Sequence, residues 1–281
     1  MREPSLMSDH NGTNPYIDTN TPNVARIYNY LLGGRDNFAS DRAAAEQIIK
    51  VVPHVRRTAR ENRSFLRRAV TQLTAKAGIR QFIDIGTGLP SKGNVHEIAQ
   101  AINPDARVTY IDNDPTAIVH ARAMLARGEG VIAILDDLRD PDSILSQPRL
   151  NALIDLDRPV ALLLVAVLHF IEDKEDPYAI VSRLLAALAP GSYLVVSHAT
   201  ADHLPSERTD QALQVYEASS TRATPRTYRQ ILRFFEGLRL VEPGLVDVRD
   251  WRPDRDEPSA DVITTCYGGS AQKPLPWEGT A

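Results

Sequence analysis

The segment Gln81-Phe82-Ile83-Asp84-Ile85-Gly86-Thr87-Gly88 decides the fold of this chain. It is a short apolar run that ends in a carboxylate and a glycine turn, which is typical of the first strand of a parallel α/β sheet. Such sheets bind ligands beyond the carboxyl ends of their strands, where glycine lets a ligand approach the backbone. Gly86, Thr87 and Gly88 therefore predict a ligand-binding turn, and a branched side chain at Gly86 is expected to fill the ligand's space.

Strands and helices alternate after this turn. We expect strands over residues 81–85, 107–112, 131–135, 160–167 and 192–197, and helices over residues 94–102, 115–126, 142–147 and 176–188. This alternation predicts right-handed βαβ units and a doubly wound, mostly parallel sheet. Residues 238–248 and 261–267 predict two closing strands, which gives a seven-stranded sheet whose last strand is antiparallel.

The chain before the sheet has helical spacing. Helices are expected over residues 23–32, 40–52 and 60–77, with Ser40 or Asp41 as a cap of the second. Later helices are expected over residues 206–219 and 225–235. The predicted organisation is a disordered N-terminus (1–20), an N-terminal helical lid (21–78), a Rossmann-like core (79–200) and a C-terminal region that is a candidate for acceptor binding (201–281).

Composition limits the kinds of partner. The net charge is -4, from 32 basic and 36 acidic residues, and no basic block follows the chain. We therefore expect neither nucleic acid nor a membrane surface as a partner. Cys266 is the only cysteine, the N-terminus lacks the apolar run of a signal peptide, and no run is long enough to span a bilayer. A soluble cytoplasmic protein without a metal is expected, and the oligomeric state stays open.

The glycine turn has two possible ligands. A dinucleotide is disfavoured because Ser91 occupies the third glycine position and Pro90 lacks an N–H, while Asp84 would face a pyrophosphate. The capping box of residues 94–97 also starts the next helix too late to meet a phosphate. S-adenosylmethionine has no phosphate, and its ammonium and sulfonium groups favour the carboxylate of Asp84.

Two further strand ends carry groups that suit an adenosine ligand. Asp112 and Asn113 follow the second strand, just over twenty residues beyond the glycines, where a carboxylate can accept hydrogen bonds from both ribose hydroxyls. Asp137 and Leu138 follow the third strand. There a carboxylate can accept from the adenine amino group while a backbone N–H donates to the ring. The series over three strands predicts a nucleoside site.

Long motifs extend this prediction to a family. They are residues 24–38, 60–66, 81–90, 110–115 and 167–171. With them the chain resembles, over nearly its whole length, an actinobacterial family of S-adenosylmethionine-dependent methyltransferases of unassigned substrate. The resemblance implies the class I, Rossmann-like fold and S-adenosylmethionine as cofactor, and it implies no acceptor. One departure is Asn29, where the first motif of the family carries Asp.

His169 is the candidate catalytic residue because it follows the apolar fourth strand. Its setting is similar to a loop of small-molecule O-methyltransferases that use a histidine base, so it is a candidate general base with an ionisation near 6.5 that Glu172 or Asp173 could shift. The alternative is a residue that only shapes the pocket. Ala166, at the end of the same strand, is expected among the cofactor contacts.

The segment from Tyr28 to Phe38 places Gly33 and Gly34 between aromatic residues. This pattern suits a lid that closes over the cofactor, although a glycine pair that ends a helix would look the same. Arg63 is a candidate partner for the methionine carboxylate, with a solvated helix face as the alternative.

Three classes of function follow. The leading one is methyl transfer to a small-molecule acceptor, with oxygen as a possible nucleophile. The second is a module that binds S-adenosylmethionine for regulation or assembly without catalysis. The third, a nicotinamide-dependent oxidoreductase, is disfavoured by Asp84 and Pro90.

Overall fold

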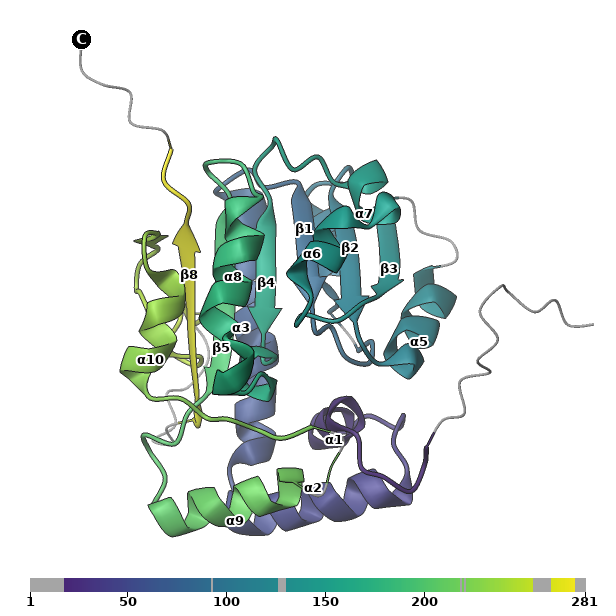
Figure 1. The fold of residues 1–281 in the computed structure, drawn as a ribbon, viewed down its shortest axis with the longest axis vertical. Coiled ribbons are helices and arrows are strands. Elements are labelled where there is room, and N and C mark those ends of the chain that lie inside the picture. The colour runs from purple at the N-terminus through teal and green to yellow at the C-terminus, as the bar shows by residue number, and fades with distance from the viewer. Residues whose placement is uncertain are drawn as a thin grey trace, which may run out of the picture.

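The structure is a computed structural model that describes residues 18–91, 93–125, 130–217, 219, 221–254 and 264–275. At its centre is a mixed sheet (Figure 1). The strands are β1 (Gln81–Ile85), β2 (Arg107–Asp112), β3 (Val131–Leu135), β4 (Ala161–Val165), β5 (Tyr193–Ala199), β6 (Arg239–Leu240), β7 (Val246–Asp247) and β8 (Cys266–Gln272). Their order is β3-β2-β1-β4-β5-β8-β6, and β7 also pairs with β8. The pairs among β1 to β5 are parallel and those of β8 are antiparallel, as expected.

Helices cover both faces of the sheet. They are α1 (Val24–Leu31), α2 (Ala39–Val51), α3 (Val55–Ala75), α4 (Val95–Ile102), α5 (Pro115–Leu125), α6 (Pro141–Ser146), α7 (Pro148–Leu153), α8 (Pro177–Ala186), α9 (Ser206–Glu217) and α10 (Tyr228–Leu232), with short 3₁₀ turns η1 (Leu168–Phe170), η2 (Asp173–Glu175) and η3 (Arg233–Phe235). The first core lies between the sheet and α6, α7, α8 and α10. The second lies between the sheet and α3, α4 and α5.

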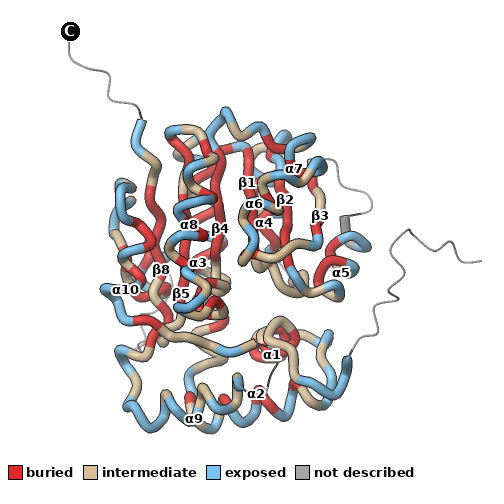
Figure 2. The backbone as a smooth tube through the Cα atoms, viewed as in Figure 1, coloured by how far each residue is buried: buried red, intermediate tan, exposed pale blue. Residues whose placement is uncertain are grey.

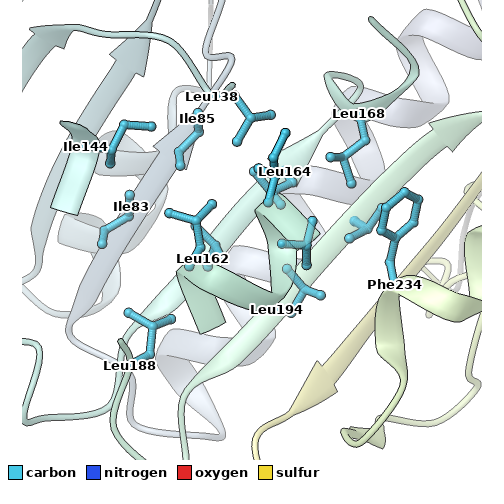
Figure 3. Close-up of a cluster of buried hydrophobic side chains, with 14 of the residues drawn as sticks. Ile83, Ile85, Leu138, Ile144, Leu162, Leu164, Leu168, Leu188, Leu194 and Phe234 are labelled. Carbon is cyan, nitrogen blue, oxygen red and sulfur yellow. The ribbon is translucent and has the colours of Figure 1, made fainter. Parts of the chain in front are cut away.

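The apolar strands explain the two cores. Successive side chains of a strand point to opposite faces, so a strand buried on both sides is apolar throughout. Ile83, Leu162 and Leu194, from β1, β4 and β5, meet in the first core (Figure 3). Phe82 and Leu163, their neighbours in sequence, belong to the second. Buried residues accordingly run along the strands (Figure 2).

The C-terminal strands differ from the prediction. The strand expected over residues 238–248 is divided into β6 and β7, because Pro243 has no N–H to donate and Gly244 turns the chain with a φ of 92°. The sheet therefore has eight strands instead of seven. The strand expected over 261–267 lies partly outside the described residues, and β8 extends to Gln272. A Cβ on Gly268 would lie 3.0 Å from the Phe65 ring, so close packing on α3 explains this small residue.

The helices also differ from the prediction, and the helix expected over residues 225–235 is divided into α10 and η3. Neither Ser40 nor Asp41 is the N-cap of α2, because the helix begins at Ala39. The fully buried carboxylate of Asp41 instead accepts hydrogen bonds from the N–H of Phe38 (2.7 Å) and from Nε of Arg26 (2.8 Å). Helix α3 begins at Val55 rather than residue 60, and α7 was not expected.

Helices α1, α2 and α9 form a separate layer beyond the carboxyl ends of the strands (Figure 1). Apolar residues of α1 and α2, such as Ile27, Leu31 and Ile48, pack together in a third core. Val215 and Tyr216 of α9 pack against them. Segments almost two hundred residues apart in sequence thus make one layer at the carboxyl ends of the strands.

The described residues carry neither a membrane-spanning helix nor a cluster of metal-binding side chains. No described helix combines the length and apolarity that crossing a membrane requires. The same residues contain no group of three or more His, Cys, Asp or Glu side chains placed to hold a metal ion.

A buried arginine joins α3 to the C-terminal segment. The guanidinium of Arg68, which is 5% exposed, donates to the carbonyl oxygens of Trp251 (2.8 Å) and Val248 (2.7 Å). The rings of Phe65 and Trp251 meet edge to face nearby, with centroids 5.4 Å apart. The guanidinium thus satisfies two carbonyl groups that would otherwise be buried without a donor.

We expect Arg68→Met to lower the free energy of unfolding by about 3 kcal/mol, because it leaves these carbonyl groups without their donor. The matched control is Arg67→Met, since Arg67 is 45% exposed and, among the described residues, pairs with the exposed Asp254. That change is expected to cost less than about 0.5 kcal/mol. Urea unfolding of both variants measures the difference, and equal losses would contradict this role of Arg68.

Candidate active site

One large cavity, of about 980 Å³, lies between the carboxyl ends of the strands and the layer of α1, α2 and α9. Every residue predicted for the site lines it. These residues are Tyr28, Gly33, Gly34, Arg63, Asp84, Gly86, Thr87, Gly88, Asp112, Asn113, Asp137, Leu138, Ala166 and His169. Parallel strands explain this convergence, because all of their carboxyl ends meet at one edge of the sheet.

Asp84 lies at the floor of the cavity and is only 6% exposed. Burial raises the pKa of its carboxyl group to about 7, the positive charge of Arg63 opposes this rise, and the negative charge of Asp112 adds to it. Arg63, half-buried on α3, also donates to the carbonyl oxygen of Gly93 (2.9 Å). A cation placed beside Asp84 would hold it in its charged form.

Asp112 fixes the glycine turn to the end of β2. Its Oδ2 accepts from the N–H of Gly88 (2.7 Å), and its Oδ1 accepts from the N–H of Asp114 (2.9 Å). Burial raises its pKa to about 6 against the effect of these hydrogen bonds. Each carboxylate oxygen retains a further lone pair, so Asp112 can still accept hydrogen bonds from ribose hydroxyls.

The end of β3 carries a paired carboxylate. Asp137 Oδ2 accepts from Nδ2 of Asn113 (3.0 Å), and its Oδ1 lies 3.2 Å from Nη1 of Arg139. Although burial opposes them, hydrogen bonds from Arg139 and Asn113 lower the pKa of Asp137. The neighbouring Asp136 instead accepts from Ser143 (3.0 Å). Asp137 is therefore the charged group that this strand presents beside Asn113.

The sequence predicted that a side chain at Gly86 would fill the space of the ligand, and this prediction is wrong. A Cβ there would lie 2.3 Å from Cγ2 of Val167, so protein, not ligand, fills that space. The φ of Gly86 is also 75°, so Gly86→Val tests folding before it tests binding. Open space lies instead at Gly88, where a Cβ would meet only the Cβ of Ala25, at 3.8 Å.

Ala166 follows β4 in the left-handed region, with a φ of 57°, which is rare for a residue other than glycine. Its N–H donates to both the carbonyl and the hydroxyl oxygen of Ser197 at 3.0 Å. The Ser197 hydroxyl donates in turn to Oδ1 of Asn62 (2.5 Å), and Nδ2 of Asn62 donates to the hydroxyl of Tyr28 (2.9 Å). A polar chain thus joins α1, through α3 and β5, to the strained residue in the cavity.

Sequence analysis missed Asn62 and Ser197. Asn62 lies within one of the quoted motifs, on the apolar face of α3 and one turn from Phe65. A polar residue on an apolar helix face indicates a buried hydrogen bond, and this pattern could have identified Asn62. Ser197 gave no such signal, because a hydroxyl at the end of a strand is common. The hydroxyl of Tyr28 is also held by its bond to the carbonyl oxygen of Ala59 (3.1 Å), and burial raises its pKa to about 12.

Asn29 organises the glycine pair after α1. Its Oδ1 accepts from the N–H of Asp36 (3.1 Å) and from Nδ2 of Asn37 (3.0 Å). A Cβ on Gly34 would lie 2.4 Å from this amide, so the turn needs glycine there. Gly33 has a φ of 85° and no heavy atom within 4 Å of a built Cβ. Because the amide oxygen accepts both bonds, Asn29 supports the turn without a carboxylate.

His169 is 8% exposed and lies in the wall of the cavity, but its environment differs from that of a base. Its Nδ1 accepts from the N–H of Ala199 (3.4 Å), which assigns the proton of the neutral ring to Nε2. Burial and then the charge of Arg226 lower its pKa to about 3, away from the ionisation expected near 6.5. Of the two roles left open by the sequence, this geometry favours the shaping of the pocket.

Arg226 holds the loop that carries His169. Its guanidinium, from a side chain 1% exposed, donates to the carbonyl oxygens of Leu168 (3.0 Å) and Ile171 (2.9 Å) and pairs with Asp173 (2.6 Å). It also donates to Nε2 of His198 (3.0 Å), whose Nδ1 donates to the carbonyl oxygen of Ala199. Sequence analysis missed this arginine, because more than fifty residues separate it from the loop.

Proteins and a family of known description are similar to nearly the whole chain. A family described as S-adenosyl methyltransferase matches residues 10–274. A crystal structure of a duf574 family protein from Streptomyces avermitilis is 41% identical, with a TM-score of 0.88, and the match covers 92% of this chain and 100% of that one. A Thermobifida fusca protein described as a candidate methyltransferase is 39% identical, with a TM-score of 0.86, covering 92% and 97%.

More distant structures share the fold alone. An O-methyltransferase family protein from Burkholderia thailandensis is 15% identical, with a TM-score of 0.52, over 80% of this chain and 62% of that one. Comparison with curated proteins returned no match. The sheet order and these matches establish a class I methyltransferase-like fold.

We expect the affinity for S-adenosylhomocysteine to fall about tenfold as the pH drops from 7.0 to 5.5. The charged form of Asp84, which would pair with the ligand's ammonium group, is fully present only above its raised pKa of about 7. Asp84→Asn should weaken binding at pH 7 and remove most of this dependence. Calorimetric titration measures both, with Asp36→Asn, an exposed carboxylate at the cavity wall, as the control. A flat affinity for the unmodified protein would contradict the pairing.

Proposed function

The chain belongs to the S-adenosyl methyltransferase family, and we propose that it transfers a methyl group to a small molecule bound in the cavity described above. Enzymes of this family use S-adenosylmethionine. One observation carries the proposal: a single cavity joins buried carboxylates at the strand ends to a second half lined by α1, α2 and α9. The first half suits the cofactor, and the second leaves room for an acceptor.

The residues at the strand ends fit this cofactor. Asp84 would pair with the ammonium group of the methionine portion, and Arg63 with its carboxylate. Asp112 would accept from the ribose hydroxyls, and Asp137 from the adenine amino group. The raised pKa values of Asp84 and Asp112 support this assignment, because a buried carboxylate of this kind gains most from a bound cation or donor.

The cofactor, when bound, supplies a methyl group on a positively charged sulfur. The protein then has to hold the acceptor in line with that group and exclude water. Ala166, held by Ser197, sets the wall at the end of β4. The layer of α1, α2 and α9 covers the opening, and we propose that its turn at Gly33 and Gly34 lets the layer close.

We propose that His169 positions the acceptor and is not the general base. With its proton on Nε2, the neutral ring offers no free lone pair. An oxygen acceptor would therefore need a hydroxyl acidic enough to lose its proton to solvent. We further propose that the enzyme works in the cytoplasm, in line with its single, buried cysteine.

Methyl transfer is tested with methyl-labelled S-adenosylmethionine and an actinobacterial cell extract that is then separated into small molecules, nucleic acid and protein. Label should enter the small-molecule fraction only when the enzyme is present. Asp112→Ala should lower the transfer about 7-fold to 80-fold at cofactor concentrations near the wild-type Kd, because it removes about 1.5–3 kcal/mol of binding. Label in the protein or nucleic acid fraction would contradict a small-molecule acceptor. Binding of cofactor without any transfer would favour a regulatory module.

Once an acceptor is known, we expect the rate at saturating cofactor to change less than about twofold between pH 6 and pH 8. His169 has a pKa of about 3, so it stays neutral over this range. His169→Gln should keep more than about a tenth of the turnover, since Gln also offers a donor of similar reach. A loss of about 10²-fold to 10⁴-fold, together with loss of a limb near pH 6.5, would instead make His169 the base.

A further inference from the structure

Helix α9 presents an apolar stripe to the cavity. The stripe consists of Thr209, Ala212, Leu213 and Tyr216, at the i, i+3, i+4 and i+7 spacing of one helix face, and all four line the cavity. Along α9, whose residues are all described, none is fully buried. A surface helix normally buries such a stripe against its own protein. Here Tyr216 packs partly against the third core, and all four residues of the stripe also line the cavity.

The walls opposite the stripe are apolar as well. Helices α1 and α2 contribute Leu31 and Ile48, Val52 follows α2 directly, and the segments after β4 and before α10 contribute Phe170 and Pro225. The outer face of α9, in contrast, is polar and carries the exposed residues Glu207, Asp210, Gln214 and Glu217. The apolar residues of α9 are therefore confined to the face that it turns toward the protein and the cavity.

The titratable groups of this half are neutral near pH 7. Burial raises the pKa of Tyr28, Tyr216 and Cys266 to about 12 each. Burial shifts the pKa of His169 in the opposite direction, to about 3, so its ring is neutral as well. The carboxyl groups Asp84, Asp112, Asp114, Asp136 and Asp137 lie at or just after the strand ends, with Arg63 and Arg139 beside them.

Two charged residues remain on the helical side, and both are at the surface. Asp36 and Arg60 line the cavity, but each is exposed to solvent. Their charges are hydrated, so they do not compensate a charge buried at the centre of the half beside α9. An ionised ligand group would lose its water there without gaining a partner.

The size of the cavity allows two ligands. Sites for one drug-sized ligand range from roughly 300 to 1,000 Å³. At about 980 Å³ this cavity lies at the upper end of that range, and because its lining extends from the strand ends to α9, we expect a cofactor at the strand ends to leave space beside α9.

We propose that the methyl acceptor is an uncharged, largely apolar molecule that packs against the stripe of Thr209, Ala212, Leu213 and Tyr216. This inference rests on the proposed function, because it assigns the second half of the same cavity to the acceptor. The apolar walls would bind the carbon skeleton by removing it from water. The bound cofactor would then meet whichever heteroatom the skeleton presents to it.

The proposal is tested with two fluorescent probes that share one aromatic skeleton. N-phenyl-1-naphthylamine is uncharged, whereas 8-anilinonaphthalene-1-sulfonate carries a sulfonate. Each is titrated into the full-length protein saturated with S-adenosylhomocysteine, and its fluorescence gives the Kd. We expect the uncharged probe to bind at least tenfold more tightly than the anionic one. Equal affinities, or a preference for the anion, would overturn the proposal.

A substitution on the stripe tests whether the probe binds beside α9. Leu213→Glu puts a charge on the stripe and should weaken binding of N-phenyl-1-naphthylamine at least tenfold, while Gln214→Glu, on the exposed face next to it, should leave the Kd unchanged. Titration with S-adenosylhomocysteine confirms that each variant is folded. If Leu213→Glu does not fold, Leu213→Gln serves in its place. An unchanged probe affinity in a folded Leu213 variant would overturn the placement on α9.

The two proposals fail in different ways. A protein that binds S-adenosylhomocysteine but shows no preference for the uncharged probe would contradict the acceptor class and leave the methyltransferase function standing. A protein that binds the uncharged probe at the stripe but no S-adenosylhomocysteine would contradict the cofactor site itself. The same titrations, carried out without S-adenosylhomocysteine, separate these outcomes.

Discussion

The burial of two carboxylates at the ends of adjacent parallel strands is the constraint on which this structure depends. Asp84 and Asp112 are only 6% and 8% exposed, and the negative charge of Asp112 adds to the rise in the pKa of Asp84. A charge held out of water in this way destabilises a protein unless donors or cations compensate it. The N–H of Gly88 and the guanidinium of Arg63 supply part of this compensation. A ligand with a positive charge and ribose hydroxyls would supply the rest.

The cavity separates two kinds of chemistry. The strand ends carry charge, which suits a sulfonium nucleoside and disfavours the pyrophosphate of a dinucleotide. The half beside α9 carries none at its centre among the described residues, which suits an apolar acceptor. Between the halves, buried polar groups fix the walls: Asn62 and Ser197 hold Ala166, and Arg226 holds the loop of His169. The site is therefore rigid where the reacting atoms would meet, while helices α1, α2 and α9 cover it.

The sequence predicted the parts of this site that are local in the chain. The strand-end residues Asp84, Asp112 and Asp137 were found because each follows an apolar run at the expected spacing, and the sheet brings them together. Contacts between distant segments gave no such pattern, so the roles of Arg226 and Ser197 were missed. The limits of β8 were misplaced for a related reason, because Gly268 packs closely on Val248 and Phe65 and Gly269 on Phe235, and glycines do not look like a strand in the sequence. The close contact of Gly86 with Val167 was also not predicted, because the two residues lie far apart in the sequence.

The central claim is that the buried carboxylates select a sulfonium nucleoside over a phosphate-containing one. Calorimetric titration of the same protein with S-adenosylmethionine and with NAD at pH 7.5 compares the two directly. The account predicts one site per chain with a Kd for S-adenosylmethionine in the micromolar range, about -8 kcal/mol of binding free energy, and no measurable heat of binding for NAD. Binding of NAD with similar affinity, or no binding of S-adenosylmethionine to the folded protein, would contradict it.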